Sequence, residues 1–162
     1  MSKKRTLVAR GGPLEDFLVV GLEHSVAGPL CTRILGDLGA KVIKIERTPG
    51  GDFARHWDDH VDGDCSQFWW LNRRKLSVAL DVKSELGRSA FERLLEQADV
   101  LVTNLSPSAT DRLGLTQAAL TQRFPALVVC QISGYGSAGP FRDRKAYDML
   151  VQAESGIMSL TG

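Results

Sequence analysis

The sequence predicts an α/β fold with an open, mostly parallel, Rossmann-like sheet and flanking helices. Short apolar runs recur along the chain, amphipathic segments separate them, and glycine or polar residues stand at the joints. Strands that alternate with helices in this way pair in parallel through right-handed crossovers. With 162 residues, 43% hydrophobic and 24% charged, the chain is large enough to bury one core.

Five segments have the character of strands buried in a parallel sheet. The first, F-L-V-V-G-L, is a continuous apolar run, and the second, K-V-I-K-I-E, alternates between apolar and charged residues. The predicted strands cover residues 17–22, 41–46, 76–80, 99–103 and 126–132.

Helical periodicity fills most of the connections between these strands. The first predicted helix has Pro29 in its first turn and ends at Gly39. Further helices are predicted over residues 84–98, 106–113, 116–124 and 146–159. Residues 48–74, rich in glycine, aspartate and aromatic residues, are predicted to be irregular, and residues 1–12 to form a disordered tail.

Charge and cysteine content exclude several classes of protein. The chain has 20 Lys and Arg against 19 Asp and Glu, a net charge of +1, so neither nucleic acid nor a membrane surface is an expected partner. No apolar run is long enough to span a bilayer, and the basic start lacks the apolar core of a signal peptide. Three widely spaced cysteines without a C-x-x-C motif indicate reduced thiols and a cytoplasmic location.

A glycine-rich segment at residues 134–139, G-Y-G-S-A-G, matches the G-x-G-x-x-G pattern of dinucleotide-binding proteins. That fingerprint has to open a helix directly after the first strand, whereas this segment follows the last strand and precedes Pro140. We therefore expect a loop close to a ligand, with a nicotinamide-binding domain as a weaker alternative.

Two further patterns have both a functional and a structural interpretation. His56 and His60 are four residues apart, a helical spacing that some metal sites use, but no third ligand is evident and no metal is expected. Phe68-Trp69-Trp70 precedes N-R-R-K at residues 72–75, which resembles an aromatic and basic patch for nucleic acid. An apolar anchor with a basic rim fits the near-zero net charge better.

Phosphate binding is the theme that connects the basic residues. Arg47 and Asn104 follow predicted strands, and open α/β sheets bind ligands at the carboxyl ends of their strands. Arg73, Arg74 and Lys75 precede the third strand, and Arg112 and Lys145 lie in later segments. Together they favour a polyanionic ligand.

Six segments, in order, resemble one known family. They are H-S-V-A-G-P at 24–29, D-L-G-A-K-V-I-K-I-E at 37–46, N-R-R-K at 72–75, D-V-L-V-T-N at 99–104, K-A-Y-D at 145–148 and G-I-M-S-L-T-G at 156–162. Together they look like the N-terminal part of the large domain of class III (CaiB/BaiF-type) coenzyme A transferases, over residues 13–162.

The resemblance implies transfer of coenzyme A (CoA) between an acyl-CoA thioester and a carboxylic acid, with a dicarboxylate such as succinate as one candidate. In that family an aspartate attacks the thioester and carries CoA as an aspartyl thioester. Tyr147 and Asp148 would support this chemistry near the reacting carbonyl. The implied CoA-binding residues are His24, Ser25, Val26, Ala27, Arg47, Lys75, Asn104, Leu105, Arg112 and Lys145. CoA is the only cofactor implied, without NAD or metal, and the full-length family implies an intertwined homodimer.

Two departures from the family pattern shape this expectation. Val26 stands where formyl-CoA transferase has a glutamine, which argues against oxalate or formate specificity. The nucleophilic aspartate of the family lies beyond the Thr-Gly at residues 161–162, and no acid here matches its motif. The sequence therefore predicts a fold incomplete relative to the family and a truncated, inactive fragment.

Two alternatives remain open at this point. The acyl-CoA racemases of the same superfamily have a histidine where this chain has Tyr147, and a phenol with a pKa of about 10 is a poor base near neutrality. A racemase or isomerase is thus less favoured than a transferase. The other alternative is a non-catalytic domain that binds CoA or a nucleotide.

Overall fold

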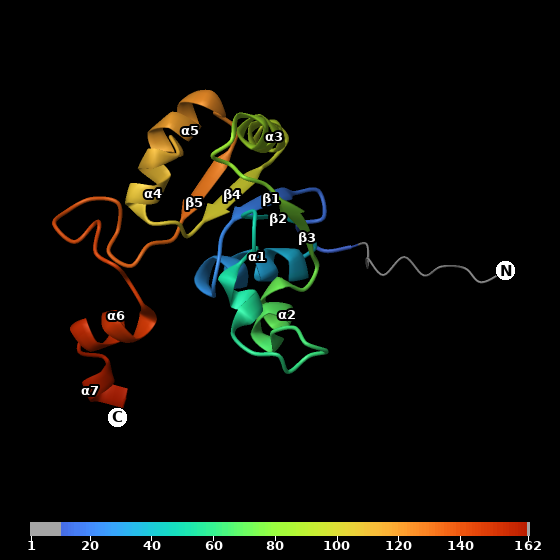
Figure 1. Cartoon of the computed structure of the whole chain (residues 1–162). Helices are drawn as coiled ribbons and strands as arrows, with labels where there is room; N and C mark the ends of the chain where they lie inside the picture. Colours follow the sequence, from blue (N-terminus) through green and yellow to red (C-terminus); the bar gives the residue numbers. More distant parts are fainter. Residues whose placement is uncertain (1–10, 162) are drawn as a thin grey trace.

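The predicted strands form one sheet in a computed structural model that describes residues 11–161 (Figure 1). Its five strands lie in the order β3-β2-β1-β4-β5, and every neighbouring pair is parallel. The strands are β1 (Leu18–Leu22), β2 (Lys41–Glu46), β3 (Lys75–Ala79), β4 (Val100–Thr103) and β5 (Val128–Gln131). The predicted open, parallel α/β sheet is confirmed.

The chain builds the sheet outward from β1 in both directions. It runs from β1 through β2 to β3 and then returns to place β4 on the other side of β1. Val20 of β1 lies opposite Ile43 of β2 and Leu101 of β4. The strand order therefore reverses between β1 and β4, the point at which open α/β sheets form ligand-binding crevices.

Helices connect the strands and cover both faces. They are α1 (Ala27–Asp37), the 3₁₀ turn η1 (Phe53–His56), α2 (Ser66–Asn72), α3 (Glu85–Leu95), α4 (Pro107–Arg112), α5 (Gln117–Arg123), α6 (Asp148–Glu154) and α7 (Met158–Thr161). Figure 1 shows α1 and α2 on one side of the sheet and α3, α4 and α5 on the other. Ser84, Ser106 and Thr116 cap α3, α4 and α5 with side-chain oxygens.

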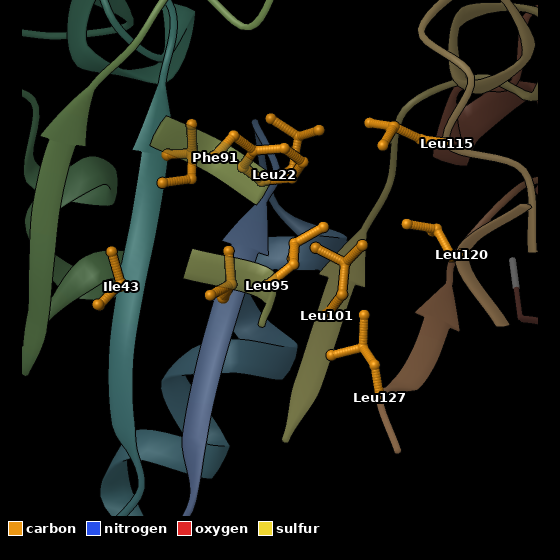
Figure 2. Packing of buried hydrophobic residues seen from close by; sticks show 10 residues of the cluster. Leu22, Ile43, Phe91, Leu95, Leu101, Leu115, Leu120 and Leu127 are labelled. Atoms are coloured by element: carbon orange, nitrogen blue, oxygen red, sulfur yellow. The ribbon is translucent and has the colours of Figure 1, made fainter. Parts of the chain in front are cut away.

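The larger apolar core lies between the sheet and the helices α3 and α5. Phe91 and Leu95 of α3 are fully buried against β-strand residues such as Ile43 and Leu101, as Figure 2 shows. Leu120 of α5 extends the same cluster toward β5. This core fixes the strand ends relative to one another.

The opposite face of the sheet packs against α1. A smaller cluster of Val19, Val42 and Val102 meets this helix. At Gly28 the helix comes so close to the sheet edge that an added Cβ would lie 2.8 Å from the Cβ of Glu23 and 3.0 Å from the Cγ of Asn104. Glycine is therefore required there for the helix to approach.

The prediction of an irregular region over 48–74 was wrong in part, because the segment contains η1 and α2. The start of α2 is stabilised by a residue far from it in sequence. Asp58 Oδ1 accepts a hydrogen bond from Ser66 N at 2.8 Å, and Asp58 Oδ2 accepts one from Ser66 Oγ at 2.9 Å. Local capping rules do not anticipate an acceptor eight residues upstream.

The predicted helix over 146–159 was wrong in part, because the segment forms two helices, α6 and α7, instead of one. Gly156 separates them with φ 75°, a left-handed conformation that ends a helix. The tail predicted over 1–12 falls mainly on residues outside the described range. Gly12, within that range, packs against Leu38 and Gly39. No helix within residues 11–161 is long and apolar enough to cross a membrane.

Candidate functional site

A groove lies at the carboxyl edge of the sheet, where parallel strands end together. It has a volume of about 440 Å³, and its floor includes Leu22 from the end of β1 and Ile45 near the end of β2. Arg47 and Lys83 contribute cations to its wall, from the segments that follow β2 and β3. A second groove of about 390 Å³ adjoins it and shares Lys83. The two grooves share Val82 and Lys83, and their linings combine the cations Arg47, Lys83, Arg88 and Arg112 with the carboxylates Asp81 and Glu85.

The loop between β1 and α1 contains the predicted residues His24, Ser25, Val26 and Ala27. Ser25 has φ 59°, a left-handed conformation that is uncommon outside glycine. Val26 is the N-cap of α1 and gives it no side-chain hydrogen bond. The positive end of the helix dipole therefore faces this edge.

Burial determines the protonation of His24. Burial lowers the pKa of its imidazole below the usual 6.5, Asp52 opposes that shift, and the Lys44 and Arg47 cations add to it. His24 is therefore neutral at pH 7. Its ring lies 5.0 Å from that of Phe53, which is 41% exposed.

Asn104 and Leu105 follow β4 directly and lie beside the β1–α1 loop. The Asn104 Oδ1 atom accepts from His24 N at 3.0 Å, and its Nδ2 donates to His24 O at 2.8 Å. The amide thus holds the loop backbone at both polar atoms. Leu105 is half-buried against the core between the sheet and α3.

Arg47 and Arg112 lie in separate grooves at the same edge. Arg47 is exposed, and its Nε donates to Gly51 O at 2.9 Å, which orients the guanidinium beside the first groove. Arg112 ends α4 and lines the second groove with Lys83 and Arg88. Arg88 is engaged by Glu92 at 2.6 Å. The predicted arginines are therefore both placed at the grooves.

Lys75 lies elsewhere, because it begins β3 and so stands at the amino end of that strand. Its side chain is 2% exposed, and Nζ donates to Glu23 Oε1, Pro29 O and Asn72 Oδ1 at 2.8, 2.8 and 2.9 Å. An ammonium has three N–H donors, so all of them are used. The structure gives Lys75 a place in the interior, whereas the resemblance implies direct contact with CoA.

Lys83 is the cation that sequence reasoning missed. It stands in the loop after β3 and lines both grooves. The signal was available, since Lys83 follows a predicted strand just as Arg47 and Asn104 do.

The remaining predicted residues lie in the segment after β5. Lys145, Tyr147 and Asp148 are exposed, and Tyr147 is the N-cap of α6 without a side-chain cap bond. No residue of α6 or α7 is buried. Figure 1 shows both helices apart from the sheet, so the structure does not bring these residues to the grooves.

The glycine-rich segment 134–139 is a loop, and the next helix, α6, begins only at Asp148. It does not open a helix as a dinucleotide fingerprint would. His56 ends η1 and His60 lies in a turn, so the two imidazoles do not share a helix face. Within residues 11–161 no group of three potential metal ligands occurs.

Residues of the aromatic and basic patch contact other residues of the same chain. The Arg55 guanidinium lies 3.9 Å from the centre of the Phe68 ring, and that of Arg33 lies 4.6 Å from Trp70. Arg73 pairs with Asp37 at 2.6 Å. The basic residues thus form a rim through contacts within the protein, but Trp69 and Trp70 are 56% and 50% exposed, so these two rings are not packed on the core.

Comparison with known proteins gives a consistent result. The family model for CoA-transferase family III matches residues 14–162. An acetyl-CoA:oxalate CoA-transferase of Acetobacter aceti is 42% identical over 93% of this chain and 39% of its own length. A human succinyl-CoA:glutarate CoA-transferase is 38% identical over 93% of this chain and 34% of its own.

A solved structure agrees with these sequence matches. A CAIB/BAIF family protein from Brucella suis superposes with a TM-score of 0.86 at 39% identity, over 93% of this chain and 41% of its own. The chain spans about two fifths of the length of the relatives it matches. On the family match and these similarities, the chain belongs to CoA-transferase family III.

Proposed function

We propose that this chain binds the CoA part of an acyl-CoA along the carboxyl edge of its sheet and so serves CoA transfer to a carboxylic acid. The observation that carries this proposal is the double groove, because it joins two apolar strand ends to cations from three separate segments. CoA, which joins phosphates to a long, less polar arm, matches this mixture of cationic and apolar residues.

The cations have the roles of phosphate partners in this proposal. Arg47, Lys83 and Arg112 meet the phosphates of CoA, and Arg47 can do so through two parallel N–H groups. Lys75 acts indirectly, since its ammonium pairs with Glu23 beneath the loop. Family membership supports a CoA ligand.

The loop from His24 to Ala27 and the turn at Asn104 and Leu105 contact the arm that leads to the thioester. A neutral His24 suits this position, because it can offer a hydrogen bond without adding a charge near the thioester. In the assembled enzyme Lys145 approaches the CoA, and Tyr147 and Asp148 approach the reacting carbonyl. Their exposure leaves them free to do so.

The transfer proceeds through a carboxylate nucleophile and so retains the free energy of the thioester instead of losing it to hydrolysis. An aspartate attacks the acyl carbonyl, the C–S bond breaks, and a mixed anhydride and CoA thiolate form. The thiolate attacks the aspartyl carbonyl and releases the donor acid. The acceptor carboxylate attacks that aspartyl thioester, which gives a second mixed anhydride and CoA thiolate. The thiolate then attacks the acceptor acyl carbonyl and frees the aspartate.

Neither acid of α6 is proposed as this nucleophile. Asp148 accepts a hydrogen bond from Gln152, and Glu154 pairs with Arg144 at 2.7 Å and accepts from Tyr135 at 2.6 Å. We propose that the 162 residues alone bind CoA without turnover. The free thiols of Cys31, Cys65 and Cys130 agree with a reducing, cytoplasmic location.

A homodimer completes the proposal. Large apolar side chains are exposed on the last two helices and between them. They are Met149 of α6 at 71%, Ile157 just before α7 at 47% and Leu160 of α7 at 86%. Exposed apolar surface of this kind marks an interaction face. We propose that the intertwined partner of the family covers it.

Calorimetric titration of the 162-residue chain with CoA, and separately with NAD, tests the binding role. Arg47→Ala and Lys83→Ala should each raise the Kd for CoA by about tenfold, the equivalent of one charge-assisted hydrogen bond. Arg73→Ala is the matched control, because it removes an exposed arginine at the opposite, amino edge of the sheet. Equal losses in all three variants, or preferential NAD binding, would overturn the proposal.

A turnover assay tests the absence of a nucleophile. Succinyl-CoA is offered with a panel of dicarboxylates, and new acyl-CoA is measured by chromatography. We expect none from this chain alone. Robust transfer would show that an acid within the chain acts as the nucleophile.

A further inference from the structure

A buried cluster of charged side chains lies under the β1–α1 loop, on the α1 face of the sheet. At its centre the Lys44 Nζ and Asp52 Oδ2 atoms are 2.9 Å apart, and the side chains are 1% and 0% exposed. Glu23 and Lys75 complete the cluster with a second pair at 2.8 Å. The two carboxylates balance the two ammonium groups, as burial of charge requires.

Asp52 connects three segments through its two oxygens. Oδ1 accepts from Ser25 N at 3.1 Å in the β1–α1 loop and from Ala54 N at 3.0 Å in η1. Oδ2 accepts from Lys44 in β2. The carboxylate therefore ties the loop both to the sheet and to the segment that carries Phe53.

Lys44 reaches the same loop from the sheet. Its Nζ also donates to Glu23 O at 3.3 Å. With the two bonds from Asn104 to His24, side chains bind consecutive backbone groups from the Glu23 carbonyl to the Ser25 N–H. The left-handed Ser25 lies at the end of this run, and such a conformation persists where its surroundings over-determine it.

We propose that Asp52 and Lys44 are positioning residues that hold the β1–α1 loop in its CoA-binding conformation. The proposal rests on the function proposed above, which places CoA against residues 24–27. A buried ion pair is weak evidence for stability, since apolar side chains of similar size often replace it without loss. The pair instead orients the loop, because Asp52 accepts a hydrogen bond from Ser25 N and Lys44 donates one to Glu23 O.

Asp52→Ala tests this role in the 162-residue chain. The exchange rate of the Ser25 amide should rise by about 100-fold or more relative to wild type, while β1 and β4 amides stay protected. The Kd for CoA should rise by about tenfold or more. Leu120→Ala is the control, because it weakens the core on the other face of the sheet and does not touch the loop. It should leave both loop readouts unchanged.

A double variant guards against loss of folding. Removal of Asp52 alone leaves the Lys44 ammonium with a Glu23 carboxylate 3.7 Å away, so the single variant is strained. Lys44→Met with Asp52→Leu removes both charges, and Glu23 keeps its pair with Lys75. This variant should fold with a melting temperature near that of wild type and still lose Ser25 protection and CoA affinity.

The outcomes separate the two proposals. If either folded variant binds CoA as wild type does, the positioning role is overturned. If wild type itself does not bind CoA, the proposed function fails, and the Ser25 exchange rate alone decides whether the pair holds the loop. If the exchange rate of the Ser25 amide is unchanged in the double variant, the claim that the Lys44 and Asp52 pair holds the loop is overturned as well.

Discussion

The chain has two regions that differ in how their side chains are held. In residues 11–132, strands and helices pack in two apolar clusters on opposite faces of the sheet, and the polar groups beneath the β1–α1 loop are bound from several elements. In residues 133–161, by contrast, α6 and α7 bury no residue. The first region therefore holds the proposed binding edge through its own contacts. The second needs other surfaces to place Tyr147 and Asp148.

The difference separates two groups of predicted site residues, those at the carboxyl edge of the sheet and those around α6. The predicted ligand-binding residues Arg47 and Asn104 come to the carboxyl edge through the sheet topology, since parallel strands end at one edge. Tyr147 and Asp148, which are proposed to approach the reacting carbonyl, lie beside or in α6, and Figure 1 shows this helix apart from the sheet.

The largest predicted effect tests the core of the first region. Phe91→Ala removes a fully buried ring from the cluster over the sheet. We expect the free energy of unfolding to fall by about 3–5 kcal/mol, from lost transfer energy and the cavity left behind. Urea unfolding followed by circular dichroism measures this. A loss below about 1 kcal/mol would mean that this core does not hold the domain together.

A smaller effect is expected at the amide that holds the loop. Asn104→Ala removes an acceptor and a donor from the His24 backbone, at 3.0 and 2.8 Å. Leaving partly buried backbone groups without partners should lower the free energy of unfolding by about 1–3 kcal/mol. The same urea titration measures it, and a neutral result would show that water replaces the amide.

The acid sensitivity of the first region depends in part on Glu46. Burial opposes its ionisation, but hydrogen bonds from Arg55, Ser77 and the Asp52 N–H hold its pKa at about 2, against 4.5 for an ordinary glutamate. A depressed carboxyl pKa stabilises the fold above pH 4.5, and that stability is lost as pH falls through about 2.

Glu46→Gln should therefore lower the free energy of unfolding at pH 7 by an amount of order 1 kcal/mol. It should also give a shallower loss of stability than wild type between pH 4.5 and 2. Urea midpoints across this range measure both effects. Parallel curves for the two proteins would assign the acid sensitivity to other carboxylates.

Sequence reasoning predicted the elements whose signals are local. The apolar runs marked all five strands, and Ser84 and Thr116 marked helix starts. The start of α2 could not be predicted in this way, because its acceptor, Asp58, comes from the preceding loop. The break at Gly156 carried a local signal that helical periodicity obscured.

The candidate site was predictable where position along a strand decides it. Arg47 and Asn104 follow strands and lie at the binding edge. Lys75 precedes its strand, and only the fold reveals that its ammonium meets Glu23 in the interior. The alternating pattern of K-V-I-K-I-E predicts a strand but not the burial of Lys44, which is 1% exposed. Its ammonium can be buried because it donates to Asp52 and to the Glu23 carbonyl, which are 8 and 21 positions away in sequence.

The smallest effect is expected in the second region. Leu160→Ser changes an 86% exposed side chain of α7. We expect the free energy of unfolding to change by less than about 0.5 kcal/mol, as for other exposed positions. A loss as large as that of Phe91→Ala would show that α7 packs on the first region and would remove the contrast between them.

The most direct test of this contrast is nuclear magnetic resonance of the 162-residue chain titrated with CoA. We predict saturable shifts for the amides of residues 24–27, Arg47, Lys83 and Asn104, at the carboxyl edge of the sheet. Residues 148–161 should keep their positions. Absence of binding, or shifts confined to residues 133–161, would contradict the proposal that the first region alone forms the CoA-binding edge.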